Sequence, residues 1–508
     1  MPTVEVLDQC RADYLPDVWR RYDLLYEGGY KIRQAVREFL KKHPFELASW
    51  YEQRLARFHF VALAAPIVDE YVSSVFQTSA QMLPAKNGGA EAEAPPAWYA
   101  DEFLPNPCCD HRGDFDEYLF HALLCSLRKR ETWTLVTFPD APAALPRPED
   151  RAQQDEAGLL RARLMPVDPL CVIDAGWDDQ GLVYAMVKTR QPIVAPLVPD
   201  GKKDRIWWTL YQREAISRWE LEIERDRLAP DKTAEPTQIV SDQRHRMAGH
   251  KRVPLVCLRQ PDGLWLMDRL GDIAEEYLRK RNSIAWFEDM VCFPQLTHEG
   301  DETLQQAKES GEAQERVNTR RGVQHVWEIA KGDTLEWLEP KGHSIELVNE
   351  RTEKLVEAGH RVAHLMASAI GPHAARAVQS AASKVRDSVQ KRVVCERYAQ
   401  DVRRYAAEIM NLVSIGRGEP IEWATSGLDQ HDVVDAEAVA AEGLTVQGLN
   451  VPSLRFKQLY AKRLVRLLLP GEETAELDAI KKEIDSAKAE DFAIDTSYSD
   501  STTVRANE

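Results

Sequence analysis

The stretch from residue 253 to residue 294 constrains this chain most, because it predicts a strand, a tight turn and a long helix in direct succession. Residues 253–258 form a short apolar run of buried-strand type, and Pro261-Asp262-Gly263 supplies a turn. Apolar residues then recur at helical spacing, at Leu266, Leu270, Ile273, Tyr277, Ile284 and Phe287. Because Pro294 disfavours helical backbone at the residue before it, we expect the helix to end near residue 291.

The other face of this expected helix is heavily charged. It carries Asp268, Asp272, Glu275, Glu276, Arg279, Lys280 and Arg281. A helix with one apolar face and one charged face packs beside other helices while it faces water. The same periodicity is also typical of an ordinary surface helix, so that alternative stays open.

The composition indicates a large, soluble and acidic protein. The chain has 508 residues, so we expect several structural units around a sizeable core. Hydrophobic residues make up 44% of it and there are 13 tryptophans, which is enough for such a core, while the formal net charge is −17. An acidic chain is a poor candidate for tight, sequence-independent DNA binding, because phosphate neutralisation by Lys and Arg supplies most of that affinity.

No targeting or membrane-spanning segment is expected. The N-terminal residues MPTVEVLDQC lack the basic and apolar regions of a secretion signal, and no apolar run is long enough to span a bilayer. We therefore expect the protein to stay in the cytoplasm of the cell that makes it.

The hydrophobic periodicity changes twice along the chain, which predicts a helix-rich α+β fold with a β-rich centre. Residues 1–80 carry apolar residues mainly at helical spacing. Between residues 164 and 219 the period approaches two, and the expected strands cover 171–173, 182–187 and 206–211. From residue 344 onward the pattern is helical again, with expected helices over 346–370, 375–415 and 454–469 and a frayed tail beyond 491.

A pair of histidines on an expected helix is the best candidate for a metal site. The chain has no glycine-rich phosphate loop, no G-x-S-x-G elbow and no HExxH motif. Glu357, His360 and His364 lie one turn apart, with His373 just beyond, and two imidazoles at i and i+4 can hold a metal. The glutamate that metalloproteases place between such histidines is missing, so solvated or hydrogen-bonded histidines are the alternative. A metal-dependent hydrolase remains a competing function.

Other candidate sites have simpler structural interpretations. The adjacent Cys108 and Cys109 lack the two-residue spacer of a zinc knuckle, which favours a loop, and residues 199–203 resemble a nuclease site but fit a turn. Three tryptophans in the β-rich centre would suit either base stacking or packing within a sheet; they are Trp207, Trp208 and Trp219. The basic cluster RVNTRRGVQH, with Arg316, Arg320 and Arg321, is either a solvated run or a contact to DNA or a partner.

The order of these elements resembles the portal protein of tailed double-stranded DNA bacteriophages. In residues 163–190, RLMPVDPLCVIDAGWDDQGLVYAMVKTR, a strand ending in Val-Ile-Asp is followed by an acidic glycine turn and a second strand. In the strand–turn–helix stretch the matching residues are Val253, Pro254, Leu255, Asp272, Ile273, Ala274, Tyr277 and Asn282. Residues 380–392, SAASKVRDSVQKR, resemble the start of the long crown helix, although Ala381-Ala382 replaces the usual glycine.

The resemblance implies a closed ring of about twelve identical subunits, which is a cyclic assembly with heterologous interfaces. It implies no enzymatic activity, no cofactor and no metal, because the ATP-driven motor is a separate protein. The implied partners are the terminase, the head–tail adaptor, the major capsid protein and the double-stranded DNA that passes through the channel. The implied location is the virion, assembled in the cytoplasm of the bacterial host, with no membrane involved.

The resemblance also divides the chain into portal parts. They are a wing at 1–260, stem helices and clip at 261–320, a channel loop with wing strands at 321–345, crown helices at 346–490 and a flexible tail at 491–508. It assigns stem packing to Leu266, Leu270, Ile273 and Tyr277, the clip to Cys292, Phe293 and Pro294, and the DNA channel to Thr319, Arg320, Arg321, Gln324 and His325. An acidic channel wall keeps DNA mobile, while a few arginines at one level touch its phosphates. Another structural virion or adaptor protein is the third possibility.

Overall fold

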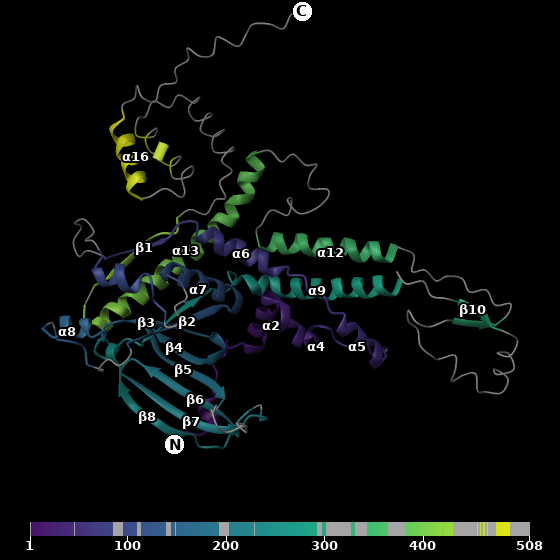
Figure 1. Ribbon diagram of the computed structural model, residues 1–508, viewed down its shortest axis with the longest axis horizontal. Helices are drawn as coiled ribbons and strands as arrows, with labels where there is room; N and C mark the ends of the chain where they lie inside the picture. Colours follow the sequence, from purple (N-terminus) through teal and green to yellow (C-terminus); the bar gives the residue numbers. More distant parts are fainter. Residues whose placement is uncertain are drawn as a thin grey trace, which may run out of the picture. The chain divides into compact units, whose positions relative to one another are not determined.

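The structure of the chain is a computed structural model (Figure 1). It describes residues 2–44, 46–84, 95–108, 113–138, 144–147, 149–192, 203–227, 229–291, 297–300, 327–330, 343–363, 381–419, 421–429 and 474–487, with five isolated residues at 455, 458, 461, 462 and 465. The chain forms two compact units, Met1–Val378 with Arg386–His431, and Gln379–Val385 with Asp432–Glu508. The second unit contains α16 (Thr474–Ser486), and the first contains the elements described below.

The described part of the first unit is rich in helices. They are α1 (Val4–Leu7), α2 (Pro16–Glu27), α3 (Gly29–Gln34), α4 (Val36–Phe39), α5 (Ala48–Ala56), α6 (Ala64–Val75), the π-helix η1 (Tyr99–Phe103), α7 (Phe115–Lys129), α8 (Arg151–Glu156), the short 3₁₀ helices η2 (Pro169–Cys171) and η3 (Arg246–His250), α9 (Leu266–Val291), α12 (His343–Val362) and α13 (Ala381–Arg417), which begins in the second unit.

Local chemistry explains where several of these helices begin and end. Pro16 opens α2, where its missing N–H is not needed. The side chain of Asp114 accepts a hydrogen bond from the N–H of Glu117 at 2.9 Å and so caps the first turn of α7. Pro66 lies in the first turn of α6, a position that tolerates proline.

Among the described residues, the strands form four sheets. They are β1 (Ala80–Pro84), β2 (Glu131–Thr137), β3 (Arg163–Val167), β4 (Val172–Asp178), β5 (Gly181–Pro192), β6 (Lys203–Gln212), β7 (Ala215–Glu224), β8 (Thr237–Arg244), β9 (Leu255–Arg259), β10 (Thr297–Gly300), β11 (Trp327–Ala330) and β12 (Trp423–Gly427). The largest sheet is an antiparallel meander in the order β4-β5-β6-β7-β8. A second sheet has the order β3-β2-β9, β1 pairs with β12, and β10 pairs with β11 in parallel. The mixed α+β class is therefore confirmed.

The meander extends beyond the region that the sequence predicted. The strands expected at 171–173, 182–187 and 206–211 correspond to β4, β5 and β6. The prediction did not include β8, whose residues are nearly all exposed. A strand that buries neither face does not alternate between apolar and polar residues, so its sequence carries no period-two signal.

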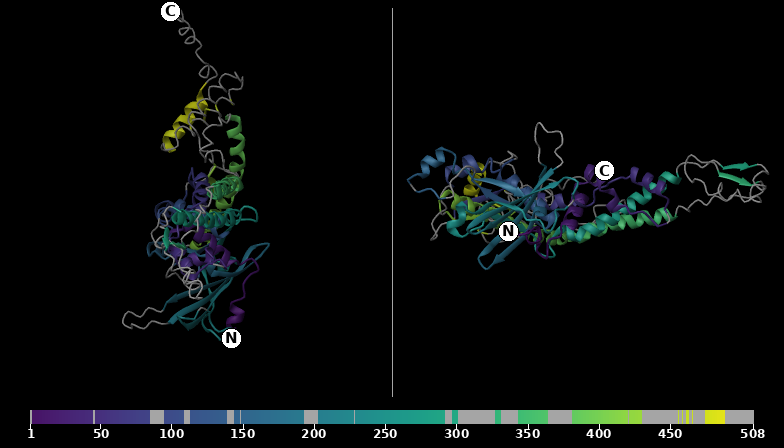
Figure 2. Two further views of the ribbon diagram at one scale, coloured as in Figure 1. Left: turned by 90° about the vertical axis from the view of Figure 1, so that its right-hand side faces the viewer. Right: turned by 90° about the horizontal axis from the view of Figure 1, so that it is seen from below.

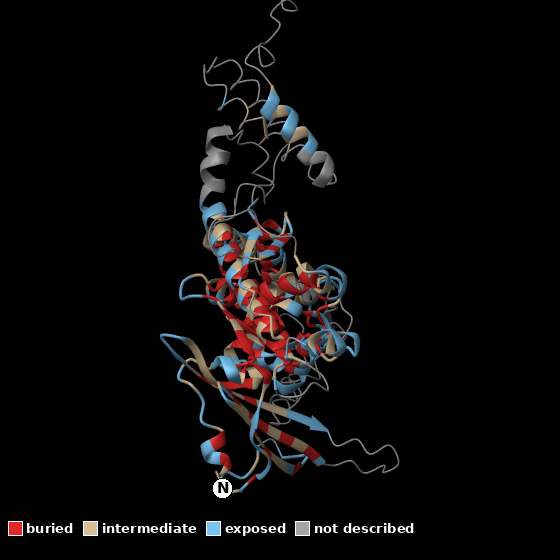
Figure 3. Ribbon diagram, turned by 90° about the vertical axis from the view of Figure 1, so that its left-hand side faces the viewer, coloured by how far each residue is buried: buried red, intermediate tan, exposed pale blue. Residues whose placement is uncertain are grey.

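Buried residues gather in three clusters, and Figure 3 shows them concentrated in the helical body and spaced along the strands. The largest cluster joins α2, α6, α7, α9 and α13 with parts of β2 and β9. A second lies between β2 and β9 on one side and β4 and β5 on the other. The third packs α1 against β6 and β7. The large sheet thus packs against β2 and β9 through the second cluster and against the N-terminal helix α1 through the third.

The N-terminal residues connect the large sheet to the body. Val4 and Leu7 are buried in the third cluster, and the N–H of Val4 donates to the carbonyl of Ala234 at 2.9 Å. Further along, the guanidinium of Arg11 forms a buried ion pair with Glu131 of β2. This first segment therefore contacts both parts of the unit.

The tryptophans of the β-rich centre pack within the sheet. Trp208 is fully buried in the third cluster, where its Nε1 donates to Asp8 at 2.7 Å, and it lies opposite Trp219 in the β6–β7 register. Trp207 is half-buried, and its Nε1 donates to Glu220 at 2.8 Å. Trp208 and Trp219 are buried and therefore do not offer their ring faces to bases, whereas Trp207 keeps part of its ring exposed.

Candidate functional site

The most distinctive part of the first unit is a pair of long antiparallel helices, α9 and α12. Figures 1 and 2 show them side by side over most of their length, with α9 leading away from the sheets and α12 returning. The chain between them contains the paired strands β10 and β11. Helix α9 begins one short turn after β9, as the sequence of the strand–turn–helix stretch predicted.

The apolar face of α9 is built from residues four positions apart. Leu266, Leu270, Ala274 and Leu278 are buried in the main cluster. Ile273 and Tyr277, also assigned to stem packing, are half-buried and pack against the same cluster. The most buried face of α9 therefore follows Leu270, Ala274 and Leu278, while Ile273 and Tyr277 lie at its edge.

Gly271 allows α9 to approach α2 closely. A Cβ atom at this position would overlap the ring of Tyr22 on α2. That ring is itself held against Trp265, with ring centroids 5.5 Å apart. Helix packing at the base of α9 therefore depends on the absence of a side chain at residue 271.

Glu275 was expected on the solvent face of α9, but it is 8% exposed. Its carboxylate accepts a hydrogen bond from Arg21 of α2 at 2.7 Å and another from Arg279 one turn along α9. Arg279 also donates to the carbonyl of Phe39 at 3.2 Å. The burial of this charge is possible because two arginines neutralise it, one of which comes from a distant part of the sequence.

Asn282 connects α9 to the segment between α5 and α6. Its Nδ2 donates to the carbonyl of His59 at 2.9 Å, and its Oδ1 accepts from the N–H of the same residue at 2.9 Å. Nearby, the guanidinium of Arg57 lies 5.5 Å from the ring centroid of Trp286. The N-terminal helices α4 and α5 thereby brace α9 well beyond its first turns.

Helix α12 packs against α9 and α6. Gly359 faces Leu63, Ile67 and Ile273, and Arg351 pairs with Glu276 of α9 at 2.8 Å. The hydroxyl of Tyr71 on α6 donates to the carbonyl of Ala363 at the end of α12. Helix α12 therefore packs along α9 within the first unit, and the boundary expected at residue 345 stays a prediction.

The later part of α13 crosses the main core. Tyr398, Val402, Tyr405 and Ile409 are buried there, and the hydroxyl of Tyr398 donates to the carbonyl of Leu264 at 2.7 Å. Most of the described residues between 346 and 490 belong to the first unit, and the assignment of this range to a crown stays a prediction.

The candidate metal site is not assembled by the described residues. His360 is half-buried on α12, where burial lowers the pKa of its imidazole, while Glu357 is exposed. His364 and His373 lie outside the described residues. No three side chains of His, Cys, Asp or Glu come together as metal ligands within the described part of the chain.

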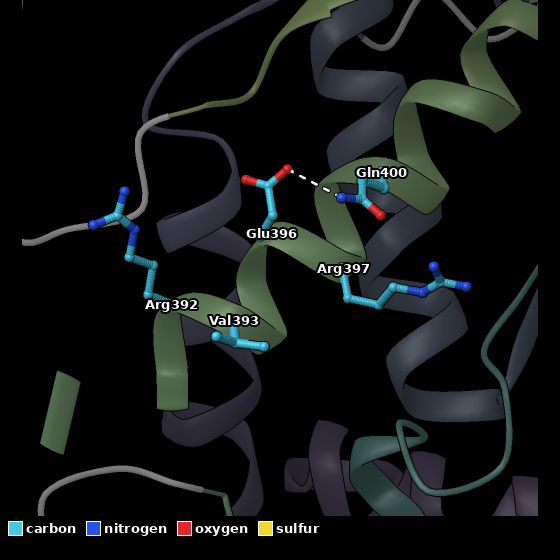
Figure 4. A pocket seen from close by; sticks show the side chains of 5 residues that line it. All are labelled: Arg392, Val393, Glu396, Arg397 and Gln400. Atoms are coloured by element: carbon cyan, nitrogen blue, oxygen red, sulfur yellow. Dashed lines mark hydrogen bonds between the residues drawn. The ribbon is translucent and has the colours of Figure 1, made fainter. Parts of the chain in front are cut away.

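A surface hollow on α13 does not have the arrangement of a ligand site. It is lined by Arg392, Val393, Glu396, Arg397 and Gln400, all from one helix (Figure 4). The two arginines point in different directions in Figure 4, and Glu396 accepts a hydrogen bond from Gln400 at 3.3 Å. These side chains do not converge on one position.

Several predicted site residues lie outside the described residues. They are the clip residues Cys292, Phe293 and Pro294, the channel residues Thr319, Arg320, Arg321, Gln324 and His325, and Arg316, Cys109 and the turn residues Pro199, Asp200 and Lys202. Cys108 is buried in the main core.

Sequence reasoning did not identify the packing roles of Gly271, Glu275 and Asn282, although one signal was present. Asn282 continues the row of buried residues at four-residue spacing from Leu266. A polar side chain in such a row indicates a hydrogen-bonding partner in the core. Its partner, His59, is too distant in sequence for the pattern to identify.

The comparisons with known proteins leave the family of this chain open. No protein-family model matches it, and no characterised protein is detectably similar to it in sequence. Among the helices that the structure describes, none combines the length and apolar character needed to cross a membrane.

Proposed function

We propose that this chain is the portal subunit of a tailed double-stranded DNA bacteriophage. The observation that carries the proposal is the antiparallel pair α9 and α12, which has its base inside the main hydrophobic core and its outer faces charged. A stem that lines a water-filled channel needs this combination, because one side must pack firmly while the other remains hydrated.

The order of elements supports the same proposal. A strand and tight turn lead into α9, an intervening segment of about fifty residues contains β10 and β11, and α12 returns to the core. In a portal subunit the intervening segment is the clip, which meets the terminase during packaging and the head–tail adaptor afterwards. The large sheet then belongs to the wing, on the outside of the ring and near the major capsid protein.

The net charge of the chain suits a channel through which DNA moves better than a surface that binds DNA tightly. With a net charge of −17, the chain offers few cations to replace the counterions of a duplex. Exposed carboxylates on α9, at Asp268 and Asp272, are of the kind that a channel wall requires if DNA is to move past it. The proposed protein works in the virion and carries out no chemistry of its own.

Ring formation tests this proposal directly. Purified full-length protein at micromolar concentration should form closed rings of about twelve copies, visible by negative-stain electron microscopy and near 0.7 MDa by mass photometry, given a chain of 57.8 kDa. Leu270→Asp is the matched negative control, since it places a charge in the buried face of α9. Monomers or dimers alone in the wild-type sample would contradict the proposal.

A further inference from the structure

The chain leaves the large sheet and enters the helical body within three residues. Strand β8 ends at residue 244, and η3 begins at residue 246. Met247 is already buried in the main cluster, and the Nη1 of the buried Arg246 donates to the carbonyl of Gly416 on α13 at 3.0 Å. His245 therefore joins a segment that belongs to the sheet to a segment that is fixed in the body.

The imidazole of His245 holds this exit segment against the end of β6. Its Nε2 donates a hydrogen bond to the carbonyl of Gln212, the last residue of β6, at 2.9 Å. Because the carbonyl is an acceptor, Nε2 carries the proton and the Nδ1 of the neutral ring carries none. Nδ1 is buried and has no hydrogen-bond partner in the described part of the chain. These surroundings suit a neutral imidazole.

The charged groups around this ring do not neutralise it. Residues 212–215 and 242–250 meet there, and their ionisable side chains are Arg213, Glu214, Asp242, Arg244, Arg246 and His250. Arg213 pairs with Asp178 at 2.6 Å. Within the described ranges none of these groups forms an ion pair with His245. Burial lowers the pKa of the His245 imidazole, and its bond to the Gln212 carbonyl offsets only part of that effect.

Strand β8 has few other contacts that would hold it. It lies at the edge of the sheet, where it pairs with β7, and none of its residues belongs to the three apolar clusters. Beyond the strand pairing, Asp242 accepts a hydrogen bond from the hydroxyl of Ser217 at 3.1 Å, and its N–H donates to the same hydroxyl at 3.2 Å. A strand with exposed residues and few apolar contacts opens more easily than the inner strands.

Protonation of His245 would place a proton on the buried Nδ1. Both nitrogens of an imidazolium are donors, and a buried donor or charge without a partner is unfavourable. The folded state therefore takes up this proton less readily than the unfolded state, whose imidazole titrates near pH 6.5. The stability that the neutral ring contributes is fully present above that pH, and it is lost as the pH falls through it.

We propose that His245 is an acid-sensitive joint between the large sheet and the helical body. Above about pH 6.5 the neutral ring holds the exit of β8 against β6. Below that pH, protonation turns the ring out toward solvent and breaks its bond to the Gln212 carbonyl. The end of β8 then opens while the body stays folded. This inference does not depend on the proposed function.

Hydrogen exchange of the full chain, measured by mass spectrometry, tests the joint. His245→Gln keeps a neutral donor for the Gln212 carbonyl at every pH. At pH 5.5, peptides that cover residues 237–250 should exchange about three to ten times faster in the wild type than in this variant, since one proton changes an opening equilibrium by at most about tenfold per pH unit. At pH 7.5 the two proteins should exchange at the same rate. Comparison at one pH cancels the intrinsic pH dependence of exchange.

Two controls separate the joint from general effects of acid. His250→Gln removes an exposed histidine of the same helix η3, and it should exchange like the wild type at both pH values. Peptides that cover residues 398–413 of α13, which lie in the main core, should exchange equally in all variants. His245→Asn is a second neutral variant, and circular dichroism verifies that each protein is folded.

The remaining outcomes decide against the joint. Equal exchange of residues 237–250 in the wild type and in the neutral variants at pH 5.5 would overturn it, as would an acid effect that His250→Gln abolishes. An equal change in the α13 peptides would mean that acid opens the whole unit. A neutral variant that exchanges faster by the same factor at both pH values would show a structural role alone. In the wild type by itself, acid must accelerate exchange at 237–250 relative to 398–413, and failure to do so also overturns the proposal.

Discussion

At the scale of single residues, polar groups inside the core carry much of the specificity of this unit. Glu275 and Asn282 lie on a helix whose pattern indicates only an apolar face and a charged face. Each is buried because a partner elsewhere in the sequence completes its hydrogen bonds. A buried polar group without such a partner would lower the free energy of unfolding. These residues therefore favour the packing of their partner segments against α9.

Asn282→Ala tests this role. The substitution leaves the N–H and carbonyl of His59 without their side-chain partner, so we expect a loss of about 1–3 kcal/mol in the free energy of unfolding. Ser283→Ala is the control, because the neighbouring hydroxyl is exposed and should matter by less than about 0.5 kcal/mol. Equal urea midpoints for both variants would show that the bonds to residue 59 contribute nothing.

At the scale of elements, local signals predicted individual helices and strands, while their pairing needed the structure. Helix α9 was predictable because its apolar residues repeat over 26 residues, and β4 to β6 because they alternate. The pairing of α9 with α12 was not predictable, because a long segment separates the two helices. The hydrophobic pattern of a helix indicates which of its faces is buried, but not which element covers that face. Strand β8 gave no signal because it buries neither face.

The glycines of the helix pair give a prediction at this scale. Gly271→Ala should destabilise the protein by about 1–3 kcal/mol, because the added Cβ overlaps the buried ring of Tyr22. Gly359→Ala should be neutral or stabilising by up to about 1 kcal/mol, since its Cβ would meet Leu63 at 3.7 Å, an ordinary contact, and alanine favours helices. Denaturant unfolding of both variants separates the cases, and equal effects would mean that α2 and α9 do not approach as closely as described.

At the scale of the whole molecule, the acidic charge and the helix pair are the features on which the proposed ring depends. The fold class was predictable from the sequence, because the change from helical to alternating periodicity is long-ranged. The assignment of residues to stem and crown stays a prediction from the resemblance, because hydrophobic periodicity does not report which helices pack together. The channel residues were inferred from resemblance alone.

Arg320 and Arg321 carry the channel prediction. Exchanging both for alanine should leave ring assembly intact and change DNA packaging or retention, because phosphate contacts from a loop add little to subunit packing. The same exchange at Arg227 and Arg244, both exposed near the large sheet, is the control. Ring fraction and packaged DNA are measured on the same samples. Weakened rings would assign the pair to a neighbouring subunit, and unchanged packaging in intact rings would exclude a channel role.

The attachment of the N-terminal residues to the large sheet sets an order of events during synthesis. Val4 and Leu7 pack against residues of β6 and β7, such as Trp208 and Ile223, which emerge from the ribosome about two hundred residues later. At about 5–20 residues per second, the first helix waits roughly 10–40 s for its binding surface. The segment made first thus stays without its binding surface until less than half of the chain has been made, and its two apolar side chains remain available to chaperones throughout that interval.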